Sequence, residues 1–174
     1  MVRSEAILPL DNYRYNDYSL VVSKSFPTSR HSLPVEDRTF VRLLKTADTL
    51  SLEVEQFLKA SGLTAAQYNV LRILRGAEPE GLACGGIGER MVSHDPDITR
   101  LLDRMEKRGL ITRQRQTDDR RVVKTRITRQ GLDLLRSLDQ PVHQLHKRQF
   151  SRLSPARLKI LTSLLDQLGT GKRA

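Results

Sequence analysis

The sequence predicts a mainly α-helical (α+β) fold with a small β component near its middle. Apolar residues recur with helical periodicity over residues 34–61 and again over residues 129–168. Between these stretches, residues 110–116 and 122–128 alternate apolar and polar side chains and are rich in β-branched residues, as strands are. We therefore expect helices toward both ends of the chain and one hairpin between them.

The first third of the chain changes character at Pro34. Residues 1–33 have weak patterning, and we interpret them as a mobile arm. A floppy tail and an arm that wraps a partner subunit or touches DNA are both compatible with that pattern. From Pro34 onward a long apolar stripe predicts a helix over residues 34–61, which ends at Gly62.

Two helices and a very short strand are expected next. Thr64 and Gln67 form the signature T-x-x-Q of a capping box, which opens a helix that runs to about Gly76. Residues 82–83 have the composition of a very short strand. Residues 85–92 predict a short helix that three glycines weaken.

The stretch DPDITRLLDRMEKRGL, residues 95–110, predicts a well-bounded helix. Asp95 can cap it, and Pro96 suits the first helical position, where a missing N–H costs nothing. Asp97 then lies in the first turn, where the helix dipole favours negative charge. Gly109 can adopt the left-handed conformation that ends the helix.

Positive charge gathers on the outward face of this helix and on the residues after it. Arg100 and Arg104 should point away from the apolar stripe, and Asp103 and Lys107 have the spacing of an i, i+4 ion pair. Residues 100–129 hold eleven Lys or Arg against four Asp or Glu, so most of the chain's net charge of +10 lies there. Such a concentration is typical of a surface that meets a polyanion, although a solvated basic face is the simpler alternative.

Two helices are expected after the hairpin. Thr128 can open the first of them, and Pro141 should kink it. Ser154 and Pro155 should start the last helix, which ends at Gly169.

The order of these elements predicts a winged helix-turn-helix. A helix, a short helix, an arginine-bearing helix and a basic hairpin follow one another within residues 63–128. The arginine-bearing helix can enter the major groove of double-stranded DNA, where polar side chains reach base edges. The hairpin can place an arginine in the adjacent minor groove, and strand cations can hold phosphates.

The chain resembles the MarR family of bacterial transcriptional regulators over about residues 35–169. The family's most specific signature is D-x-R followed, after five residues, by an apolar residue and threonine; Asp119, Arg121, Ile127 and Thr128 match it. The matching stretches are LTAAQYNVLRIL (63–74), DITRLLDRMEKRGLITRQ (97–114), DDRRVVKTRITRQG (118–131) and LSPARLKILTSLLDQL (153–168).

The resemblance implies a transcriptional regulator, by family default a repressor, that binds an inverted-repeat operator as a homodimer and is released by a small ligand. It divides the chain into an arm (1–33), an N-terminal dimerisation helix (34–62), a winged helix-turn-helix lobe (63–128) and C-terminal dimerisation helices (129–174). Helices 35–60 and 154–168 have more apolar surface than one small DNA-binding lobe can cover, which agrees with a dimer.

The resemblance also implies which recognition-helix residues approach DNA. Pro96, Asp97, Thr99 and Arg100 fall where bases and backbone are met. Arg100 is the main candidate for a base-edge contact, with guanine as its target. A phosphate clamp is the alternative role for Arg100.

The remaining DNA-binding candidates are basic residues of the hairpin and of the recognition helix. Arg121 and Arg120 would be the wing arginines, and Asp119 would steady the wing by pairing with an arginine such as Arg104. Further contacts to the phosphate backbone are expected from three strand residues that could equally be solvated, Arg113, Arg115 and Lys124.

A small aromatic acid is the expected ligand, because the family often binds phenolic and other aromatic acids between the dimer helices and the DNA-binding lobe. Arg42, Tyr68 and Arg72 lie near that junction in the sequence. Core packing or solvent exposure would also account for each of the three.

Other functional classes find little support. We see no paired-carboxylate, nucleophile–base or phosphate-loop constellation, so neither an enzyme nor a cofactor is expected. Redox sensing through Cys84 and a protein-interaction module without an operator remain alternatives. His143 and His146 lie three residues apart but have no further metal ligand nearby. A single cysteine and the lack of an apolar run of about 20 residues favour a cytoplasmic protein without a membrane segment.

Overall fold

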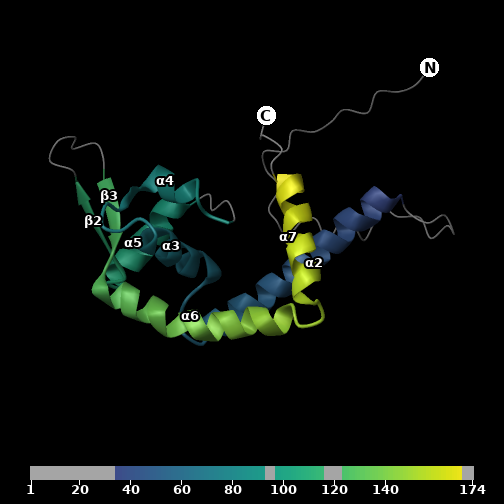
Figure 1. Cartoon of the computed structure of the whole chain (residues 1–174). Coiled ribbons are helices and arrows are strands. Elements are labelled where there is room, and N and C mark those ends of the chain that lie inside the picture. Colours follow the sequence, from purple (N-terminus) through teal and green to yellow (C-terminus); the bar gives the residue numbers. More distant parts are fainter. Residues whose placement is uncertain (1–33, 93–96, 116–122, 170–174) are drawn as a thin grey trace, which may run out of the picture. The chain divides into compact units, whose positions relative to one another are not determined.

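The structure is a computed structural model that describes residues 34–92, 97–115 and 123–169 (Figure 1). It has two compact units that meet in sequence between Thr49 and Leu50. Helix α2 (Val35–Lys59) begins in the first unit and continues into the second. The elements of the second unit are α3 (Ala65–Arg75), β1 (Leu82–Ala83), α4 (Cys84–Gly88), α5 (Ile98–Lys107), β2 (Ile111–Arg115), β3 (Val123–Ile127), α6 (Arg129–Gln149) and α7 (Pro155–Gly169). The mainly helical α+β class is confirmed.

Two of the predicted helix starts are confirmed by their hydrogen bonds. The Thr64 hydroxyl accepts the N–H of Gln67 at 3.2 Å, and the Gln67 side chain accepts the N–H of Thr64 at 3.1 Å, which closes the capping box of α3. The Thr128 hydroxyl accepts the N–H of Gly131 at 3.0 Å and so caps α6. These caps satisfy amide groups that a helix leaves free in its first turn.

The predicted start of α5 is wrong. Its N-cap is Asp97, whose carboxylate accepts the N–H of Arg100 at 3.3 Å, and the helix begins at Ile98. Asp95 and Pro96, the expected cap and first residue, lie outside the described residues. Aspartate on either side of the proline can cap a helix, so the local pattern offered two starts. Gly109 ends the element as expected, with φ +71°.

Helix α4 differs in extent from expectation, because it ends at Gly88, four residues before the predicted limit. Helix α6 has 21 residues and includes Pro141, the residue at which a kink is predicted.

The sheet has three antiparallel strands with β3 in the centre, in the order β1-β3-β2. Ile111 pairs with Ile127 and Arg113 with Thr125, while Leu82 of β1 pairs with Thr125 from the other side. Side chains of a strand alternate between its faces, so Ile111 and Arg113 share the face toward the core. Thr125 is buried.

The apolar stripe of α5 lies in the core of the second unit, as predicted. Leu101, Leu102 and Met105 are buried, and Ile98 is partly buried. They belong to one core cluster with apolar residues of α2, α3, α4, β2 and α6, among them Leu58, Leu71, Leu74, Ile87, Ile111 and Leu135. Burial of one face fixes which side chains of α5 face outward.

The start of α6 is joined to the segment that links α5 and β2. The Thr128 hydroxyl donates to the carbonyl oxygen of Gly109 at 2.7 Å, and the Thr128 N–H donates to that of Leu110 at 3.1 Å. A Cβ added at Gly131 would lie 2.3 Å from the Leu110 carbonyl oxygen. The backbones therefore approach one another as closely as only glycine allows.

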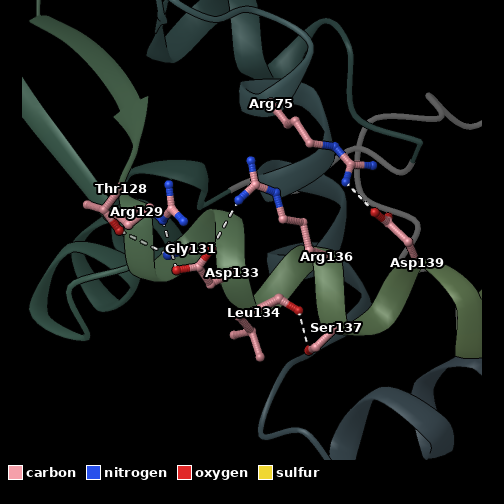
Figure 2. A network of polar contacts seen from close by, with 9 residues as sticks. All are labelled: Arg75, Thr128, Arg129, Gly131, Asp133, Leu134, Arg136, Ser137 and Asp139. Carbon is pink, nitrogen blue, oxygen red and sulfur yellow. Dashed lines mark hydrogen bonds and ion pairs between the residues drawn. The ribbon is translucent and has the colours of Figure 1, made fainter.

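Ion pairs join α6 to α3 and extend along its first turns (Figure 2). Arg75 of α3 reaches Asp139 of α6 at 2.7 Å. Asp133 lies between Arg129, at 3.0 Å, and Arg136, at 3.2 Å. The Arg75–Asp139 pair therefore joins α6 to α3, whereas the two pairs of Asp133 lie within α6 itself.

Candidate nucleic-acid interface

The outward face of α5 carries the predicted recognition residues. Asp97, Thr99, Arg100 and Arg104 are all exposed, whereas the opposite face is buried. The side chain of Arg100 is 78% exposed. The amphipathic pattern of α5 therefore leaves this polar row accessible to a large partner.

Asp97 and Arg100 interact twice at the beginning of α5. One carboxylate oxygen of Asp97 accepts the backbone N–H of Arg100, and the other lies 3.2 Å from Arg100 Nε. The same carboxylate thus caps the helix and pairs with the guanidinium one turn further on.

Arg113 is placed differently from the expectation that it contacts phosphate. Its backbone N–H donates to Glu106 Oε1 at 3.0 Å, and its Nε donates to Glu106 Oε2 at 2.9 Å. Its Nη2 pairs with both Asp103 and Glu106. The helical spacing had suggested that Asp103 pairs with Lys107. In the structure Asp103 pairs with Arg113 instead.

The environment of Arg113 stabilises its charge within the protein. Its side chain is only 26% exposed. Hydrogen bonding to Glu106 raises the pKa of Arg113, burial opposes this, and the bond to Asp103 adds to it. The guanidinium holds β2 against α5, and its single positive charge offsets part of the charge of the two α5 carboxylates.

Sequence reasoning missed this cluster, although a signal for it exists. Asp103 and Glu106 are three residues apart and share a helix face, and Arg113 shares the core-facing side of its strand with Ile111. The missing information was the register of the strand against the helix.

Two other arginines of the basic segment also serve internal contacts. Arg108 donates to the carbonyl oxygen of Gly62 at 2.8 Å and to Gln67 at 3.2 Å. Arg126 donates to the carbonyl oxygen of Pro79 at 3.0 Å, which joins β3 to the turn after α3. The net charge of the segment therefore overstates the number of cations available to a polyanion.

The remaining cations of the segment divide into paired and accessible ones. Lys124, predicted to contact phosphate, is partly buried and lies 4.0 Å from Glu80. Among the described residues, Arg104, Lys107 and Arg115 are exposed and have no ion-pair partner. Pro96 and the wing residues Asp119, Arg120 and Arg121 lie outside the described residues.

The structure brings together two of the three residues predicted to bind a ligand. The guanidinium of Arg72 lies 5.9 Å from the ring centre of Tyr68, within range of a cation–π contact. Burial raises the pKa of Tyr68, while the charge of Arg72 lowers it. Tyr68 belongs to the core, and Arg42 lies on α2 in the first unit.

A shallow cleft of about 550 Å³ lies beside the C-terminal end of α3. Arg72 and Arg90 line it, together with Glu78 and Glu80, and Tyr68 does not. The predicted trio therefore does not form the lining of this cleft.

The described residues also include the cysteine and the histidines that the sequence analysis considered for redox sensing and metal binding. Cys84 is a free thiol of intermediate exposure at the start of α4. His146 interacts with Gln149 at 3.0 Å, and no group of three metal-ligating side chains occurs among the described residues. None of the described helices combines the length and apolarity needed to cross a bilayer.

Comparison with known proteins agrees with this geometry. The model of the MarR family matches residues 63–123, from the residue before the cap of α3 to the first residue of β3. The chain is 28% identical over 152 residues to the transcriptional repressor MprA of Escherichia coli K12, covering 82% of this chain and 86% of that protein.

Solved structures give the same result. The chain shares 38% sequence identity with a MarR transcription factor from Planctomyces limnophilus whose crystal structure is known. The two structures match with a TM-score of 0.61, over 79% of this chain and 99% of that one. A mutant MarR from Escherichia coli in complex with operator DNA has a TM-score of 0.70 at 23% identity, covering 80% of this chain and 99% of that one. The relatives are regulators rather than enzymes, and the protein described here belongs to the MarR family of transcriptional regulators.

Proposed function

We propose that the chain is a sequence-specific repressor that binds an inverted-repeat operator as a homodimer and is released by a small ligand. The observation that carries this proposal is the exposed polar row of α5, Asp97, Thr99, Arg100 and Arg104, beside a hairpin that Arg113 holds in place. The operator complex of the related MarR from Escherichia coli supports the same role for this fold.

In this proposal the N-terminal half of α5 enters the major groove. Arg100 donates to the O6 and N7 atoms of a guanine, and Thr99 approaches a base or the backbone. Arg104 and Arg115 contact phosphates, which fixes register without reading sequence. By family resemblance, Pro96 belongs to this surface, and Arg120 and Arg121 extend it into the minor groove.

A second copy of the chain is the partner that the apolar faces require. No residue of α7 is buried, and Ile160, Leu164, Leu165 and Leu168 are exposed. Phe40 and Leu43 of α2 are exposed as well. A two-fold axis through these helices would set two recognition helices about 34 Å apart, one helical turn of DNA.

We propose that an aromatic acid releases the protein from its operator. The ligand is an aromatic carboxylate that pairs with Arg72 beside the ring of Tyr68. Calorimetric titration of the purified protein with a panel of aromatic acids tests this part. Operator affinity that none of these acids changes would remove this class of ligand.

The decisive experiment selects genomic DNA fragments with the purified protein and then measures affinity at several salt concentrations. We expect a near-palindromic site and a linear fall of log affinity with log salt, since bound cations displace counterions from phosphates. Affinity for the selected site equal to that for random duplex would refute an operator-binding function. It would leave the winged helix as a protein-interaction module.

A further inference from the structure

We propose that Asp97 determines operator specificity by positioning Arg100, which it holds at the Nε edge so that the two Nη groups face a guanine. This inference rests on the proposed function and specifies how the recognition helix reads its site. It also decides between the two roles left open for Arg100, favouring base reading over a phosphate clamp.

The geometry gives the Asp97 carboxylate two tasks, one for each oxygen. Oδ1 accepts the backbone N–H of Arg100 at 3.3 Å, which caps α5. Oδ2 lies 3.2 Å from Nε of the same residue. Because the cap fixes the carboxylate relative to the helix axis, the guanidinium is tied to a fixed point.

The guanidinium has five N–H donors in a rigid planar fork. Because the Asp97 carboxylate lies on the Nε side of the guanidinium as an ion pair, the two Nη groups at the other end stay available for a bidentate contact. Guanine presents two adjacent acceptors, O6 and N7, in the major groove. The pairing with Asp97 therefore leaves the guanidinium with the donor arrangement that a guanine edge requires.

The Asp97 carboxylate also disfavours contact of Arg100 with the phosphate backbone. A negative group beside Arg100 repels phosphate oxygens, so an excursion of the guanidinium toward the backbone becomes less favourable. The same repulsion lowers affinity for every duplex, whatever its sequence. Asp97 should thus improve discrimination while it weakens non-specific binding.

The solvent exposure of Asp97 and Arg100 limits how much their pairing can change operator discrimination. Asp97 is 51% and Arg100 78% exposed, so solvent screens their attraction. An exposed pair of this kind shifts an equilibrium by up to about fivefold. The two half-sites of a symmetric operator would multiply that factor.

The test uses Asp97→Asn in the full chain. Asparagine caps helices about as well as aspartate, so the variant keeps the hydrogen bond to the Arg100 N–H and loses the charge. Asp97→Ser, which also retains a capping oxygen, is the second variant, and thermal unfolding checks that both are folded. The readout is the ratio of affinities for the selected operator and for random duplex.

We expect Asp97→Asn to lower this ratio by about threefold to fivefold per half-site, with unchanged or tighter binding to random duplex. In an Arg100→Ala background the same substitution should leave the ratio unchanged. Replacing the contacted guanine by 7-deazaguanine, which lacks N7, should cost the wild type more than Asp97→Asn.

Two results would overturn the inference alone. One is an unaltered ratio in both capping variants, and the other is an equal loss with and without Arg100, which would mean that Asp97 acts by itself. A wild-type protein that prefers no duplex over random competitor would instead refute the proposed function, and the inference with it.

Discussion

Arg113 of β2 meets Glu106 of α5 through its backbone and its side chain together, with N–H to Oε1 at 3.0 Å and Nε to Oε2 at 2.9 Å. Arg113 lies in the most basic segment of the chain, yet it connects the hairpin strand β2 to helix α5. This contact holds β2 against α5, the two elements that meet neighbouring grooves in the proposed function.

Replacement of Arg113 by glutamine should weaken operator binding without removing a phosphate contact. We expect a loss of affinity with little change in the slope of log affinity against log salt, because the guanidinium is already neutralised by two carboxylates. Arg115→Gln is the matched control, two residues further along the same strand and exposed; it should flatten the slope by about one unit. Fluorescence anisotropy at four or more salt concentrations separates the two behaviours.

The same variant should also be less stable. Loss of charge-assisted hydrogen bonds that leaves Glu106 and Asp103 without their cation should cost about 1–3 kcal/mol. Urea denaturation measures this directly. A slope change near one unit for Arg113→Gln, equal to that of Arg115→Gln, would show that Arg113 contacts phosphate after all.

Gly131→Ala should destabilise the second unit, because its new methyl group would lie 2.3 Å from the Leu110 carbonyl oxygen. Overpacking against backbone costs about 1–3 kcal/mol or more, since a carbonyl group cannot swing away as a side chain can. Gly85→Ala is the control, because nothing lies within 4 Å of its added Cβ. That control should be neutral or stabilising by a few tenths of a kcal/mol to about 1 kcal/mol. Equal melting temperatures for the two variants would contradict the described junction of α6.

Tyr68 should make the protein less stable in strong alkali. Its pKa is raised chiefly by burial, so the unfolded chain releases the phenol proton at a lower pH than the folded one. The unfolding free energy contributed by the neutral phenol is complete below pH ~10 and falls as the pH rises above that value. The difference in unfolding free energy between wild type and Tyr68→Phe, measured from pH 8 to 11, should decrease above pH ~10. A difference that is constant across this range would show that burial does not raise the pKa of Tyr68.

Leu164→Glu should shift the chain toward the monomer. Leu164 is 52% exposed on a helix without buried residues, so a charge there should disturb any partner surface far more than the isolated chain. Thr162→Glu, whose hydroxyl bonds to the Leu158 carbonyl on the same helix, is a control for added charge. Sedimentation velocity would report the two states. A wild-type protein that remains monomeric at all concentrations would end the dimer proposal.

The elements that the sequence predicted well are those with local causes. Thr64 with Gln67 and Thr128 each close hydrogen bonds within four residues, so their capping could be inferred without knowledge of the fold. The buried stripe of α5 follows from spacing alone. The start of α5 was misassigned because Asp95 and Asp97 satisfy the same local rule.

The basic surface was harder to predict, because the sequence shows which residues are cationic but not which groups they contact in the fold. Arg108 reaches a carbonyl oxygen 46 residues away, and Arg126 one that is 47 residues away. Arg113 depends on how a strand lies against a helix. Counting cations therefore pointed to this segment, yet it could not separate the exposed Arg104 and Arg115 from arginines that hold the fold together.

The close approach of Gly131 to Leu110 attaches the first turn of α6 tightly to the segment that follows α5. The helix has 21 residues and so extends for about 30 Å. Its first turn is bonded through Thr128 to the segment that follows the recognition helix. Because these bonds and the close approach at Gly131 leave the first turn of α6 little room to move separately, we expect a tilt at the far end of α6 to be transmitted to the segment that follows α5.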